Sequence, residues 1–192
     1  VLRTSGMDMP ARVSRRIFIK AAIGATAASS SLMLSGCGEH YAVDRKLEFA
    51  SLSAALAEAE KLASSAITES GSLWTLPQTL VHCAQSIEYS MSGFPQMKSE
   101  LFQDTAGAAA FSFFAWRGRM SHDLTEAIPG APPLTPETGI AQAMTRLRNS
   151  IANFELWREP LQPHFAYGQL DKPDYEIAHA MHLANHFSAI AV

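Results

Sequence analysis

The chain has 192 residues, of which 47% are hydrophobic and 17% are charged, and its formal net charge is −3. Such a composition is that of a globular protein with a sizeable apolar core. The slightly acidic balance disfavours nucleic acid as a partner, because a phosphate backbone is bound through an excess of basic side chains.

The first 36 residues are expected to be an export signal and not part of the fold. Arg15 and Arg16 are followed by a moderately apolar run, rich in Ala, Ser and Gly, that is too short for a convincing membrane span. The segment 14–20 resembles a twin-arginine signal, and the segment 34–37 resembles the lipobox at which lipoprotein signal peptidase cuts. This resemblance implies export by the twin-arginine machinery and a lipid anchor on Cys37, facing the periplasm in a bacterial cell envelope.

Removal of residues 1–36 would leave about 156 residues, a length that suits one domain. The removed segment holds five of the 15 basic residues and one of the 18 acidic residues, so the remainder has a net charge of about −7. With Cys37 lipidated, Cys83 has no disulfide partner, and stability must come from packing. We expect a polar tether over residues 37–48 and a helical domain over residues 49–192.

Apolar residues at helical spacing predict an all-α domain. The first helix begins near Leu52, keeps its apolar stripe to Ile67 and is stopped by Gly71. The second begins at the segment 75–78, Thr-Leu-Pro-Gln, which has the form of a capping box with proline in the first turn, and it runs to about Met91. The third, Leu101 to Arg117, is rich in aromatic residues that we assign to the core or to a packing surface.

A long connection from about Gly118 to Thr135 then suggests a crossover along the helices. The segment 135–137, Thr-Pro-Glu, is expected to cap a fourth helix, which ends before Pro160. In the last helix, Asp171 and Asp174 suit the N-cap and the third helical position.

Three histidines share one face of this last helix: His179, His182 and His186. A neutral imidazole is a common ligand for divalent metals, and a pair at i and i+4 can hold one ion between adjacent turns. No charged residue lies between Ile177 and Val192, so the helix should be buried. Buried imidazoles need partners. Two interpretations follow, a metal site and a hydrogen-bonded core cluster.

The second helix carries a stripe of uncharged polar side chains that we expect to face inward; its members are Gln78, His82, Gln85, Ser86 and Tyr89. Glu88 is the only charged residue of this helix. Ser86, Glu88 and Tyr89 are therefore candidates to support a metal ligand or to act in acid–base chemistry.

His82 together with the His182 and His186 pair resembles the DinB-like superfamily of metal-binding four-helix bundles. The segment 74–86, the loop 163–168 and the helix that begins near Tyr175 are similar to the domain-of-unknown-function family 1569, over about residues 49–187. The resemblance implies a four-helix bundle with a long crossover and a site in which His82, His182 and His186 bind Zn, Ni, Fe or Mn. This chain departs from those relatives at Asn185, since they tend to have two consecutive histidines where it has Asn185 followed by His186.

For the superfamily, the implied chemistry is that of a metal-dependent hydrolase or a thiol-dependent transferase acting on a small molecule. The alternative is a non-catalytic binding or structural bundle. His179, His164 and Tyr167 are further candidates to support or line the site, and His179 is the alternative third ligand if His82 points elsewhere. His40 and His122 are expected on the surface, and Cys83 is expected to be a buried thiol with no nucleophilic role.

Overall fold

Helices dominate the part of the chain that the structure describes, which comprises residues 43–67, 69–70, 74–135 and 138–192 of a computed structural model. All of these residues belong to one unit, Cys37–Val192. The predicted all-α class is confirmed. The predicted signal over residues 1–36 with Arg15 and Arg16, the lipidation site Cys37, and His40 lie outside the described residues. None of the described helices is long and apolar enough to span a membrane.

In chain order the helices are α1 (Leu52–Ser64), α2 (Leu76–Ser92), α3 (Glu100–Phe102), the π-helical turn η2 (Gln103–Gly107), α4 (Ala108–Arg117), α5 (Ile140–Leu156) and α6 (Lys172–Ser188). Two short strands, β1 (Glu69–Ser70) and β2 (Ile190–Ala191), pair antiparallel. This pairing places Glu69 opposite Ala191 and so joins the end of the chain to the segment after α1.

Side-chain caps fix the starts of the two helices that matter most for function. At α2, Thr75 Oγ1 accepts from the Gln78 backbone N–H and Gln78 Oε1 accepts from that of Thr75, which confirms the predicted capping box. At α6, Asp171 Oδ1 accepts from the Asp174 backbone N–H at 2.8 Å, as predicted. The angular positions of the side chains along α2 and α6 follow from these starts.

Two predicted helix boundaries were wrong. Helix α1 ends at Ser64 and does not continue past Ile67, because the hydroxyls of Ser64 and Ser65 bond back to carbonyls of the last turn; Ile67 is 41% exposed. Helix α5 begins at Ile140, with Gly139 as N-cap. Thr135 does not cap it; its hydroxyl is hydrogen-bonded to that of Thr138.

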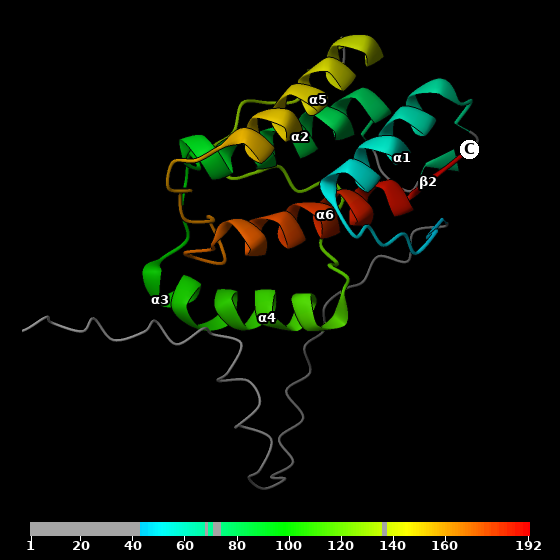
Figure 1. Ribbon diagram of the computed structural model, residues 1–192. Helices are drawn as coiled ribbons and strands as arrows, with labels where there is room; N and C mark the ends of the chain where they lie inside the picture. Colours follow the sequence, from blue (N-terminus) through cyan, green and yellow to red (C-terminus); the bar gives the residue numbers. More distant parts are fainter. Residues whose placement is uncertain (1–42, 68, 71–73, 136–137) are drawn as a thin grey trace, which may run out of the picture. The chain divides into compact units, whose positions relative to one another are not determined.

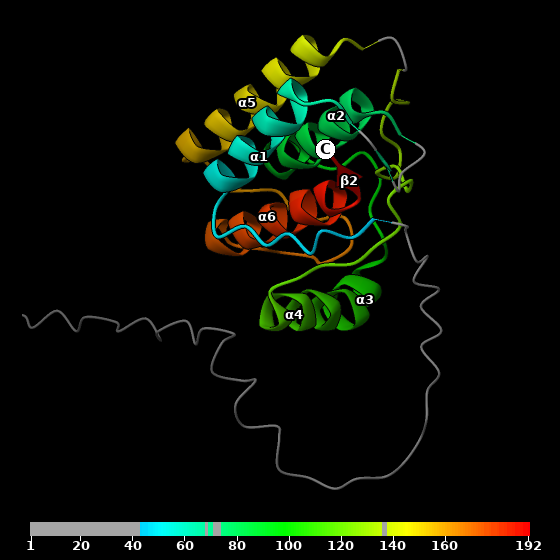
Figure 2. The same ribbon diagram turned by 90° about the vertical axis from the view of Figure 1, so that its right-hand side faces the viewer.

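Helix α6 lies between α4 on one side and the group formed by α1, α2 and α5 on the other (Figures 1 and 2). Helix α2 packs mainly on α5 and also contacts α6, while α1 contacts both α5 and α6. The helical period of the apolar residues also predicts one shared core of nine residues, and this core is present. Leu56 is half-buried, and the buried members are Leu52, Leu80, Ile87, Phe111, Leu147, Ile151, Leu183 and Phe187. Both faces of α6 are thus covered, which explains the lack of charged residues from Ile177 to its end.

The third predicted helix contains a π-helical turn at Gln103–Gly107. A Cβ atom added at Gly107 would lie 1.8 Å from the Ala166 carbonyl oxygen, so the helix can approach the loop before α6 only with glycine at this position. Its aromatic residues are only partly core. Phe111 is buried, whereas Phe113 is 50% exposed and Trp116 is 79% exposed.

Residues 43–48, the described part of the predicted tether, contact the helical domain. The Arg45 backbone N–H donates to the Ser188 carbonyl at 2.9 Å, and the Leu47 backbone N–H donates to Ser188 Oγ at 2.9 Å. Arg45 also forms an ion pair with Glu58 of α1 at 2.7 Å. This segment therefore runs along the end of α6 as part of the fold.

Candidate metal centre

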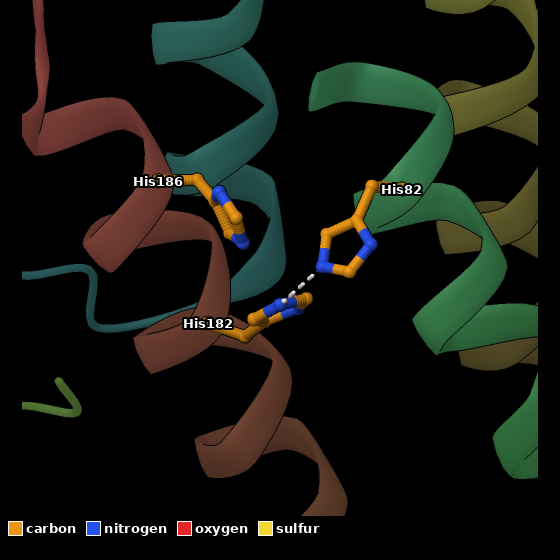
Figure 3. Close-up of side chains that lie close together, drawn as sticks. All are labelled: His82, His182 and His186. Carbon is orange, nitrogen blue, oxygen red and sulfur yellow. Dashed lines mark hydrogen bonds between the residues drawn. The ribbon is translucent and has the colours of Figure 1, made fainter. Parts of the chain in front are cut away.

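Three imidazoles from two helices meet between α2 and α6 (Figure 3). His82 comes from the second turn of α2, and His182 and His186 lie one turn apart on the face of α6 that α2 covers. One nitrogen from each ring can be chosen so that all three lie within 4.8 Å of one another. His82 Nε2 and His182 Nε2 are hydrogen-bonded at 3.1 Å.

The three rings are buried, and most of their nitrogens have no hydrogen-bond partner in the described structure. The exposed fractions of His82, His182 and His186 are 2%, 9% and 1%. His82 Nδ1, His182 Nδ1 and both nitrogens of His186 are buried without a hydrogen-bond partner in the described structure. A buried polar atom without a partner costs about 1–3 kcal/mol, and native proteins hold few of them. Such atoms gathered in one place indicate a site for a ligand that binds nitrogen.

Burial also keeps these rings neutral. The pKa of His82 is lowered to about 3, first because burial penalises the charged ring and second because His122 lies nearby. Burial lowers the pKa of His182 and His186 well below the usual value for the same first reason, with neighbouring histidines adding to it. A neutral imidazole has a free lone pair, which is the form that coordinates a metal.

The geometry fits a tetrahedral ion with little rearrangement. Metal–nitrogen bonds of about 2.0–2.1 Å at tetrahedral angles place two ligand nitrogens roughly 3.3 Å apart. The separation between His82 Nε2 and His182 Nε2 is already near this value. Because one nitrogen of each ring lies within 4.8 Å of the other two, shifts of roughly 1–2 Å, which ring rotation can supply, would bring all three to this spacing. Three imidazoles then leave one coordination position for another ligand.

Two further rings border the cluster, and the sequence had assigned neither of them to it. The Trp74 ring lies 4.8 Å from the His82 ring, centre to centre, and is stacked at 6.1 Å on the His186 ring. The His122 ring lies 5.1 Å from that of His182 and 5.0 Å from that of His186. The prediction that His122 is a surface residue was therefore wrong.

The residues around His122 follow a pattern that indicates the inward orientation of its ring. Met120 and Leu124 are buried, Ser121 and Asp123 are exposed, and the His122 ring faces inward between them. This is the alternation of an extended segment, in which every second side chain points the same way. It directs His122 toward α6 from the connection between α4 and α5.

A pocket of about 200 Å³ opens on the outer side of His122. It is also lined by Met181 and Asn185 of α6 and by Asp44 and Arg119, which pair with each other at 3.4 Å. Pockets for small molecules are usually larger than this, so the size fits a ligand of few atoms. Of the histidines around the cluster, only His122 lines this pocket.

His179, His164 and Tyr167 lie in a separate group of rings. His179 Nε2 is hydrogen-bonded to Ser90 Oγ at 3.2 Å, and its ring stacks on Tyr175 at 5.3 Å. The His164 ring stacks on Tyr167 at 4.3 Å, and its Nδ1 accepts from the backbone N–H groups of Ala166 and Tyr167. These contacts give His164 a role in closing the loop before α6. They do not place it against the three histidines.

Two of the three acid–base candidates of α2, Glu88 and Tyr89, have partners outside the cluster. Glu88 accepts two hydrogen bonds from Arg146 of α5, at 2.9 and 2.6 Å, in a half-exposed pair. Tyr89 packs its ring on Phe94 at 5.8 Å. Ser86, one turn after His82, is buried. Cys83 is fully buried, as predicted, and burial raises the pKa of its thiol.

The comparison with known proteins agrees with the second resemblance seen in the sequence. No curated protein matches the chain, and no solved structure matches it. A family model described as "Protein of unknown function (DUF1569)" matches residues 42–191, which include every histidine of the cluster and nearly all described residues. The chain belongs to the DUF1569 family.

Proposed function

We propose that this protein is an exported, lipid-anchored metalloprotein of DinB-like type, in which His82, His182 and His186 bind one divalent ion, and that it acts on a small molecule. One observation carries the metal: three neutral, buried imidazoles each offer one nitrogen within 4.8 Å of the other two, and His186 has no hydrogen-bond partner for either of its nitrogens. A core cluster held by hydrogen bonds alone would leave both nitrogens of His186 unpartnered at a cost. The donor set suits Zn, Ni, Fe or Mn.

A comparison of two variants of α6 tests the metal. In His186→Ala, one ligand is lost, so a saturating zinc addition should raise the melting temperature far less than in the wild type, because only tight binding to the native state stabilises it. His179→Ala is the matched control. It removes a buried histidine from the same helix but from the other ring group, and it should keep the full zinc-dependent rise above its own metal-free value. Equal zinc-dependent rises in wild type and His186→Ala would refute the site.

A role in catalysis is supported by the combination of an open coordination position and the adjacent pocket of about 200 Å³. A divalent ion held by three imidazoles supplies Lewis-acid chemistry, lowering the pKa of a water molecule or a thiol that reaches the remaining position. The chain contributes neutral ligands, a site largely closed to bulk water, and the pocket as a path for the small molecule. Metal-dependent hydrolysis and thiol-dependent transfer both use an ion with a coordination position that a water molecule or a thiol can reach.

Cobalt can separate these two reaction classes. The cobalt-loaded protein should be titrated with a low-molecular-weight thiol such as glutathione and followed by near-ultraviolet absorption. A sulfur-to-cobalt charge-transfer band would support the transferase class. Absence of the band at saturating thiol, with hydrolysis of small ester or amide substrates, would support the hydrolase class. A loaded protein that binds no thiol and turns over no substrate would leave the non-catalytic binding bundle as the function.

Export and anchoring are proposed from the sequence of residues 14–20 and 34–37. In a bacterial host with a twin-arginine pathway, a palmitate analogue should label the wild-type protein, and the label should be lost in Cys37→Ser. Replacement of Arg15 and Arg16 by lysine should leave the unprocessed chain inside the cell. Labelling that survives Cys37→Ser would contradict the lipid anchor, and normal processing of the lysine variant would contradict the twin-arginine route.

A further inference from the structure

His122 differs from the other histidines of the cluster in the element that carries it. His82, His182 and His186 are fixed by α2 and α6, whereas His122 lies in the irregular connection between α4 and α5. Its ring is nevertheless nearly as close to His182 and His186, at 5.1 and 5.0 Å between ring centres, as those two rings are to each other at 4.8 Å, although its nitrogens are not among those that gather within 4.8 Å.

The hydrogen bonds of His122 fix which nitrogen can bind a metal. His122 Nδ1 lies 2.8 Å from the Asp123 carbonyl oxygen, which can only accept, so Nδ1 carries the proton. The lone pair is then on Nε2, and this atom is buried without a hydrogen-bond partner in the described structure. Metal-binding histidines commonly donate their other N–H to a backbone carbonyl in this way.

The backbone that supplies this carbonyl is itself held in place. Asp123 Oδ1 accepts from the Thr125 backbone N–H and from Thr125 Oγ1, both at 2.8 Å, in a local turn. Met120 and Leu124 anchor the segment in the core on either side of His122. Asn185 of α6 donates to the His122 carbonyl oxygen at 3.4 Å. These hydrogen bonds and buried side chains therefore hold the segment so that the His122 ring faces the cluster.

We propose that His122 is a fourth, displaceable imidazole ligand, which occupies the remaining coordination position and yields it to a small anionic ligand that enters from the pocket. This inference rests on the proposed three-histidine site. The pocket of about 200 Å³ is lined by His122 but by none of the other three histidines, so His122 stands between the pocket and the cluster. Arg117 and Arg119 also line the pocket together with Asp44, which pairs with Arg119, so the lining keeps one net positive charge that would favour an anion.

The position of His122 in a connecting segment explains why it, and not a histidine of a helix, would be displaced from the metal. Moving His182 or His186 out of the site would require α6 to unwind or shift, and that helix is packed on both faces. Moving His122 requires a change only in a connecting segment, whose contact with α6 through Asn185 is one long hydrogen bond. A site with four imidazoles is closed, and loss of the fourth opens it.

The first test compares zinc affinity and azide affinity in the full chain. His122→Ala should bind zinc about 10- to 100-fold more weakly than the wild type. The cobalt-loaded variant should bind azide, a small anionic metal ligand, at least about tenfold more tightly than cobalt-loaded wild type, because azide no longer competes with an imidazole. Added imidazole should restore the wild-type cobalt spectrum to His122→Ala. Wild-type zinc and azide affinities in the variant would overturn the proposal.

Different outcomes would refute the three-histidine site and the role of His122 as a fourth ligand. If wild type binds no metal, the proposed function itself is wrong. If wild type binds zinc, His182→Ala does not, and His122→Ala matches wild type, only the role of His122 is wrong. If His122→Ala does not fold, wild-type protein labelled with ¹⁵N-histidine decides: a large shift of the His122 Nε2 resonance on zinc binding supports coordination, and an unchanged resonance contradicts it.

Discussion

His82 Nε2 lies 3.1 Å from His182 Nε2, although 100 residues separate the two histidines in the chain. The contact exists because α2 and α6 pack together and because their caps, at Thr75 and Asp171, set the rotation of each helix. It brings two neutral, buried nitrogens to nearly the spacing that a tetrahedral ion requires of its ligands. Both the proposed metal site and the proposed role of His122 depend on this contact.

The buried histidines should make the metal-free protein sensitive to mild acid. The pKa values of His82, His164 and His179 are each lowered to about 3 by burial, against about 6.5 in the unfolded chain. Between these values the unfolded state binds more protons than the native state, so the free energy of unfolding falls as pH falls from about 6.5 toward about 3. Urea denaturation at pH 7, 6 and 5 measures this slope.

His179→Gln provides the control for that slope. It removes one buried imidazole outside the metal cluster, so the free energy of unfolding should vary less steeply with pH, by about 1.4 kcal/mol per pH unit below pH 6. The variant should also be less stable at neutral pH, because the bond to Ser90 and the stacking on Tyr175 change. A slope equal to that of wild type would contradict a buried, neutral His179.

Gly107→Ala should destabilise the fold. The added methyl carbon would lie 1.8 Å from the Ala166 carbonyl oxygen, a backbone atom that cannot turn aside as a side chain can. Overpacking of this kind costs about 1–3 kcal/mol or more. The matched control is Gly139→Ala, where nothing lies within 4 Å of the added carbon, and its effect should stay within about 0.5 kcal/mol. Equal thermal stabilities of the two variants would contradict the tight contact between the π-helical turn and the loop.

Glu88→Gln should leave zinc affinity unchanged. The carboxylate is held by Arg146 in a half-exposed pair on the α5 side of α2, away from the histidines. The expected loss of stability is small, up to about 1 kcal/mol, as for other exposed ion pairs. Zinc titration of the variant measures the first quantity and thermal unfolding the second. A tenfold or greater change in zinc affinity would restore Glu88 as a residue that supports the metal site.

The sequence predicted the helices through their apolar period and their caps, and it selected His82, His182 and His186 through uncharged helical faces. It missed His122 because that residue lies in a connecting segment with no helical period, where only a short alternation of buried and exposed residues marks the inward direction. It also named Glu88, His164 and His179 as candidates to support the site, and the structure gives each of them another partner. Their partners Arg146, Tyr167 and Ser90 are set by tertiary packing, which spacing along one helix does not reveal.

X-ray absorption at the metal edge of the zinc-loaded full chain tests the central claim most directly, since it counts the atoms bound to the ion and gives their distances. One zinc per chain is expected, with at least three imidazole nitrogens at about 2.0–2.1 Å, and His182→Ala should lose this binding. A chain that binds no stoichiometric zinc, nickel, iron or manganese, or an ion bound mainly by oxygen and unaffected by His182→Ala, would contradict the account.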